Sequence, residues 1–147
     1  MIVAPSVAVL LSLNAAEPGH ASPDMAHEAA APSPASTAAA GPARAWLALV
    51  DHEDWLASWR AAGSIFRARI SAEGWTSAIV PVRKPLGAVA ARTLTTVTKA
   101  ASLPGAPAGD YTVLEFRTDF AARRGAIETV VLAREPVAWR VDGYFIR

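Results

Sequence analysis

The acidic segment Asp51-His52-Glu53-Asp54 places a histidine among three carboxylates within four consecutive residues. Imidazole and carboxylate groups bind divalent metals and carry protons in acid–base catalysis. Consecutive residues of a helix point in different directions, however, so four adjacent side chains do not converge on one ion. Asp51 and Asp54 also suit N-cap and first-turn positions, where negative charge meets the helix dipole. Capping is the interpretation we prefer, and we expect neither a metal site nor a cofactor.

A second set of reactive groups, Asp119, Tyr144 and His52, lies far apart in the sequence. In an isomerase or dehydratase such groups would line a cavity between helices and a sheet, where burial raises the pKa of a carboxylate. The competing interpretation places Asp119 on an exposed strand face and the Tyr144 ring in the core. An enzyme of this type that uses a cavity carboxylate is therefore the alternative hypothesis, and we predict no catalytic residues.

Four aromatic residues are the weak candidates for ligand binding: Trp75, Phe116, Trp139 and Tyr144. On one face of a curved sheet they would hold an apolar ligand or a peptide, or pair with a second copy of the chain in a homodimer. Ordinary core packing explains the same residues. We rank binding above catalysis because it requires no specific catalytic geometry.

The composition excludes several classes of activity. The chain has no cysteine, so disulfides, thiolate nucleophiles and cysteine-ligated metals are impossible. No Gly-x-Ser-x-Gly elbow and no phosphate-binding glycine loop occurs. All 14 Lys and Arg residues follow Ala43, whereas three of the 13 carboxylates precede it, which leaves residues 44–147 with a formal charge of +4. These cations are scattered rather than clustered, so we expect no nucleic-acid partner.

The helices that must position these residues are predicted from apolar spacing. Apolar residues recur at i, i+3 and i+4 from Trp46 to Val50 and again from Trp55 to Trp59, which indicates two short helices around the acidic segment. Residues 65–70 read as a short connecting element. Ser71 is a suitable N-cap for a third helix over 72–83, disturbed near Pro81.

Four runs with a period of two follow the helices. They cover residues 89–99, 111–120, 127–134 and 137–146, and the connections between them are short. Short connections indicate an antiparallel meander. A bulge is expected at Gly143, where the alternation of the last run shifts. The predicted fold class is α+β, with three N-terminal helices packed on a curved four-stranded antiparallel sheet.

The first third of the chain differs from the rest. Residues 2–13 form an apolar run with the length of a signal-peptide h-region, too short to span a bilayer, and small residues follow it. No Lys or Arg precedes the run, so a disordered cytoplasmic N-terminus is the alternative. We assign residues 1–21 to a signal peptide, 22–43 to a disordered linker rich in Ala and Pro, and 44–147 to one domain.

A family resemblance extends over this domain. The segments that carry it are Trp46-Leu47-Ala48-Leu49-Val50-Asp51, Trp55-Leu56-Ala57-Ser58-Trp59, Glu73-Gly74-Trp75, Arg83-Lys84-Pro85-Leu86-Gly87, Ser102-Leu103-Pro104-Gly105-Ala106-Pro107 and the C-terminal run from Trp139 to Arg147. In these segments the chain resembles a bacterial exported family catalogued as domain of unknown function 4019. The resemblance implies a small exported domain and supplies no catalytic residues. The element order is also similar to nuclear transport factor two-like and cystatin-like folds.

These observations together predict an exported, periplasmic or secreted domain without enzymatic activity. It would act as a module that binds a small ligand or another protein. The partner is not identified by the sequence.

The signal assignment can be tested directly. Deleting residues 1–16 is expected to abolish export, because the deletion removes the apolar segment that a translocation pathway recognises. Immunoblots of periplasmic and cytoplasmic fractions measure the effect. Unchanged periplasmic delivery of the truncated chain would refute the assignment.

Overall fold

The computed structural model describes the backbone of residues 34–147 and the side chains from Ala38 onward. The signal peptide assigned to residues 1–21 and the first part of the linker lie outside the described residues. Within the described range the helices are α1 (Pro34–Asp51), α2 (Trp55–Ala61), α3 (Ser64–Arg69), α4 (Ala72–Arg83) and the short 3-10 helix η1 (Lys84–Leu86). The strands are β1 (Val89–Ala100), β2 (Tyr111–Phe120), β3 (Ala126–Arg134) and β4 (Trp139–Ile146).

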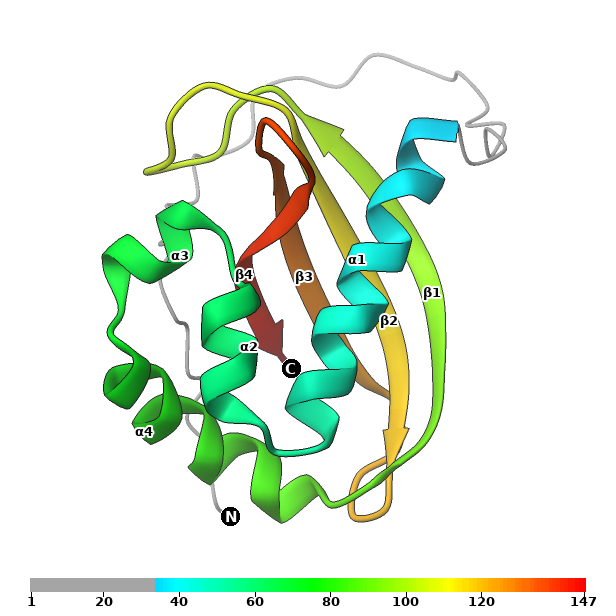
Figure 1. Cartoon of the computed structure of the whole chain (residues 1–147). Coiled ribbons are helices and arrows are strands. Elements are labelled where there is room, and N and C mark those ends of the chain that lie inside the picture. Colours follow the sequence, from blue (N-terminus) through cyan, green and yellow to red (C-terminus); the bar gives the residue numbers. More distant parts are fainter. Residues whose placement is uncertain (1–33) are drawn as a thin grey trace, which may run out of the picture.

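The strands form one antiparallel sheet in the order β1-β2-β3-β4, so the predicted meander is confirmed. Helix α1 lies across the sheet and contacts all four strands, while α2 packs between α1 and α4 and α3 contacts β4 (Figure 1). The α+β class with a four-stranded antiparallel sheet is therefore correct. The number of helices is not, because the connecting element expected over residues 65–70 is largely the additional helix α3 (Ser64–Arg69).

The predicted linker boundary at Ala43 is wrong, because α1 already begins at Pro34. Proline suits the first position of a helix, where no backbone N–H is needed, and the following segment is rich in alanine, the strongest helix former. Ala39 and Ala43 are fully buried, and each lies seven residues before another core residue of α1, Trp46 and Val50 respectively. Their small side chains continue the apolar face of α1. From composition alone, this alanine-rich segment is predicted to be a linker.

Aromatic residues from the helices and the last strand fill the core between the two layers. The rings of Trp46, Phe66, Trp75 and Tyr144 lie with centroids 5.0–6.4 Å apart, mostly edge to face. The indole Nε1 of Trp46 donates to the Ser58 carbonyl at 2.8 Å, and that of Trp75 donates to the Ser58 hydroxyl at 3.0 Å. These bonds satisfy the buried indoles and join α1, α2 and α4.

The predicted bulge in the last strand is present. Val131 pairs with Gly143 and Leu132 with Val141, so Asp142 is the extra residue. The bulge lets both Val141 and Tyr144 reach the helix-covered core. It also directs the Asp142 carboxylate to α3, where Oδ1 accepts a hydrogen bond from the Phe66 N–H at 3.1 Å. Burial raises the pKa of Asp142, and the Phe66 bond opposes this only in part.

This contact leaves no room for a side chain at Gly63, which precedes α3. A Cβ there would collide with the buried Asp142 carboxylate, so Gly63→Ala should destabilise the domain by about 1–3 kcal/mol through overpacking. Gly41 is the matched control, because it lies inside α1 with open space around its Cβ position. Gly41→Ala should stabilise by about 0.5–1 kcal/mol. Urea unfolding of both variants measures the two changes, and a neutral Gly63→Ala would contradict the close contact.

Candidate functional site

A chain of charged side chains crosses from the helices into the sheet. The Arg92 guanidinium on β1 contacts both carboxylate oxygens of Asp51, the last residue of α1, at 2.6 and 2.9 Å. On its other side it donates to Glu128 of β3 at 2.7 and 3.2 Å. We call Asp51, Arg83, Arg92 and Glu128 the ion-pair network. Burial alone would lower the pKa of Arg92, but the hydrogen bonds with the two carboxylates outweigh it, so Arg92 stays charged.

Glu128 is fully buried at the inner end of this network. Besides Arg92 it accepts hydrogen bonds from the Thr118 hydroxyl and from the Tyr144 hydroxyl, each at 2.5 Å. A carboxylate has about four acceptor positions, and here all four are occupied. Burial, and then the neighbouring Glu128 charge, raise the pKa of Tyr144 well above its ordinary value, so this hydroxyl remains a donor. The arrangement holds Glu128 in place and leaves no oxygen for a substrate.

Arg83 joins the network from the end of α4. Its Nη2 donates to Asp51 at 2.8 Å, and the guanidinium lies over the Phe120 ring, 4.6 Å from the centroid. Among the described residues, Nε and Nη1 of Arg83 have no hydrogen-bond partner although they are buried. The ring face of Phe120 offsets part of that cost through a cation–π contact.

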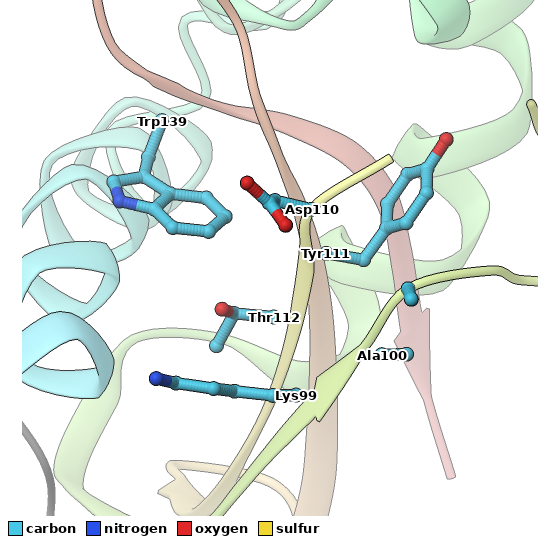
Figure 2. A pocket seen from close by; sticks show the side chains of 7 residues that line it. Lys99, Ala100, Asp110, Tyr111, Thr112 and Trp139 are labelled. Atoms are coloured by element: carbon cyan, nitrogen blue, oxygen red, sulfur yellow. The ribbon is translucent and has the colours of Figure 1, made fainter. Parts of the chain in front are cut away.

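A pocket opens at the opposite end of β2. Its volume is about 360 Å³, and it is lined by Lys99, Ala100, Ala101, Asp110, Tyr111, Thr112 and Trp139. Figure 2 shows the side chains of Lys99, Asp110 and Thr112 directed to the side on which Trp139 lies, whereas the Tyr111 ring points away. We call this the β1–β2 pocket. It has the size of a small-molecule site at the lower end of the usual range, about 300–1,000 Å³.

Thr112 is the unusual member of the pocket lining. The residue is fully buried, yet its hydroxyl has no hydrogen-bond partner among the described residues. Thr112 lies on the same face of β2 as Leu114, because side chains two apart share a face. An unpaired buried hydroxyl costs about 1–3 kcal/mol, so the fold keeps an unfavourable group where the pocket begins.

The pocket and the network both fall within a stretch that matches a known family. Residues 42–144 match the family described as protein of unknown function (DUF4019). The chain belongs to this family. The resemblance of the sequence segments is thereby confirmed. No curated protein and no solved structure matches the chain.

In this DUF4019 domain the four aromatic candidates do not share one surface. Trp75, Phe116 and Tyr144 are buried in the core, at 1%, 0% and 3% exposure. A second cavity beside Trp75 and Tyr144 holds only about 20 Å³, room for little more than one water molecule. Trp139 is half-buried and lines the β1–β2 pocket. Of the four, only Trp139 borders a space of ligand size.

The acidic segment plays structural roles. Asp54 caps α2, because its carboxylate accepts a hydrogen bond from the Ala57 N–H at 3.1 Å. Asp51 is instead the last residue of α1 and pairs with two arginines, so the capping role predicted for Asp51 is wrong. His52 is exposed. Asp119 accepts from the Gly125 N–H at 2.7 Å and closes the β2–β3 turn. None of these three carboxylates faces the β1–β2 pocket.

Residues 34–147 contain no group of three or more His, Asp or Glu side chains placed to hold a metal ion. No helix in this range combines the length and the apolar character needed to cross a bilayer.

The sequence reasoning missed Arg92, Glu128, Lys99, Asp110 and Thr112. The period of two in β3 does predict that Glu128 faces the core, because the core residues Val130 and Leu132 lie on the same face of the strand. The same alternation from Leu114 places Thr112 inward. What the pattern could not supply was the partner: Arg92 lies 36 positions away in the sequence and meets Glu128 only through the strand order.

Replacement of Glu128 tests the network. Glu128→Gln should lower the free energy of unfolding by about 3–5 kcal/mol, because it leaves Arg92 buried beside a neutral group. Glu115→Gln is the matched control, since its partner Arg147 is 66% exposed, and its loss should stay within about 1 kcal/mol. Chemical denaturation measures both. Equal losses of unfolding free energy in the two variants would show that the buried ion pair contributes no more to stability than the exposed one.

Proposed function

We propose that this domain is an exported module without enzymatic activity that binds a small ligand in the β1–β2 pocket. The observation that carries the proposal is the buried, unpartnered hydroxyl of Thr112 at a pocket of about 360 Å³. A ligand that hydrogen-bonds to Thr112 removes the cost of that unpaired group, while Trp139 offers it an apolar ring. Export rests on the apolar run of residues 2–13.

The alternative, an isomerase or dehydratase, needs a carboxylate that is both buried and accessible to a substrate. Glu128 is buried but all its acceptor positions are filled, and Asp110 at the pocket is exposed. Asp142 is buried, but it lines neither of the two cavities described above. The geometry of the described residues therefore favours binding over proton abstraction. A protein partner remains the other binding hypothesis, and a pocket of this volume favours a small molecule.

The state of Thr112 is tested by removing its hydroxyl without changing the shape of the side chain. Thr112→Val should leave the ligand-free domain equally stable or stabilise it by up to about 1–3 kcal/mol, because no hydrogen bond is lost. Thr118→Val is the matched control: this residue is equally buried on the same strand but donates to Glu128. Thr118→Val should lower the stability of the domain. Thermal unfolding distinguishes the pair, and a destabilising Thr112→Val would show that the hydroxyl already has a partner.

The binding function is tested by filling the pocket. Native mass spectrometry of the chain purified from its own cell compartment should detect a bound small molecule. Ala101→Trp places a large ring at the pocket lining and should abolish this adduct. Ala122→Trp, at the exposed β2–β3 turn, should leave it unchanged. An adduct that survives Ala101→Trp, or a bare chain in every preparation, would overturn the proposal.

A further inference from the structure

The β1–β2 pocket carries one cation and one anion. Lys99 near the end of β1 and Asp110 just before β2 both line it, and both are exposed. Neither forms an ion pair with any residue of the described range. The pocket therefore presents two opposite charges that are free to contact a bound molecule.

The register of the sheet places the backbones of the two charged residues near each other. Lys99 pairs with Thr112, and Asp110 lies two residues before Thr112, immediately outside β2. Diagonal neighbours of an antiparallel pair have Cα atoms about 7–8 Å apart, so the side chains of Lys99 and Asp110 start close enough to contact one small molecule. Thr112, directly opposite Lys99, lines the same pocket. Figure 2 shows all three side chains directed to the Trp139 side.

This arrangement matches a molecule with both charges better than one with a single charge. A simple anion attracted to Lys99 would meet the Asp110 carboxylate, and a simple cation would meet the Lys99 ammonium. A zwitterion satisfies both. An extended peptide spans about 3.3–3.6 Å per residue, so the charged ends of a dipeptide lie roughly 7 Å apart. A dipeptide also carries a peptide group between its charged ends, which can hydrogen-bond to Thr112 and which a single amino acid lacks.

We infer that the ligand is a zwitterion of dipeptide length. Its carboxylate lies against Lys99, its ammonium group lies against Asp110, and its peptide group hydrogen-bonds to the Thr112 hydroxyl. An apolar side chain of the ligand packs on the Trp139 ring. The inference rests on the proposed binding function and specifies the chemical class of the ligand.

Isothermal titration calorimetry on the full domain, with alanyl-phenylalanine as the probe, tests the inference. N-acetylation or C-terminal amidation of the probe should each weaken binding about fivefold, the factor expected for loss of one solvent-accessible ion pair. Free phenylalanine, which is shorter, should bind more weakly than the dipeptide. Equal binding of the blocked and unblocked peptides would overturn the inference.

Two variants assign the charges to their partners. Lys99→Met should weaken binding of the free dipeptide about fivefold but leave binding of the amidated peptide unchanged. Asp110→Asn should also weaken binding of the free dipeptide about fivefold, but leave binding of the acetylated peptide unchanged. Lys84→Met is the control, because this lysine pairs with Glu53 outside the pocket. All three residues are exposed, so the fold should be retained, as circular dichroism can verify.

The outcomes separate this inference from the proposed function. A native adduct that is lost in Ala101→Trp but is not a zwitterion, with no binding of the dipeptide, would overturn the ligand class and keep the pocket. Absence of both the adduct and dipeptide binding would overturn both. Dipeptide binding that Lys99→Met and Asp110→Asn leave unchanged would contradict the assigned contacts.

Discussion

The contact on which the rest of the structure depends is the double ion pair of Arg92. One guanidinium links Asp51 at the end of α1 to Glu128 in the interior of the sheet. Charges this deeply buried are costly unless their partners are held in place. Each element of the network therefore restricts the others: α1 and α4 must end beside Asp51 and Arg83, and β1 must pair with β2 in the observed register.

The same contact organises the aromatic core. Tyr144 donates to Glu128, and its ring meets Trp46 and Trp75 at centroid distances of 5.3 and 6.4 Å. The hydroxyl end of Tyr144 thus belongs to the network and its ring belongs to the core. This dual role explains why the last strand needs a bulge: without the extra residue Asp142, Tyr144 would face the other side of the sheet.

Two threonines on β2 distinguish the end of the sheet at the ion-pair network from the end at the β1–β2 pocket. Thr118 and Thr112 are both fully buried on the same face, six residues or roughly 20 Å apart. Thr118 donates to Glu128, whereas Thr112 has no partner within the described range and borders the β1–β2 pocket. This difference between two equivalent buried hydroxyls is the observation that supports the proposed ligand site.

Apolar patterning in the sequence is enough to predict most elements of this protein and their order. Apolar periodicity identified α2, α4 and the four strands, because a side chain that must reach the core recurs with the period of its element. It also identified the bulge and the family. It failed at the start of α1, where buried alanines resemble a linker in composition, and at α3, whose N-terminus is held by Asp142 and Glu135 from distant parts of the chain.

Tertiary structure decided the rest. Asp51, Arg92 and Glu128 meet across 36 to 41 positions of sequence, and local pattern carries no information about such partners. The pocket likewise exists only because β1 and β2 pair in one register and Trp139 arrives from β4. Side-chain periodicity says which face a residue occupies. Which residue it meets there depends on strand pairing and helix packing, and the chemistry of a site arises from those meetings.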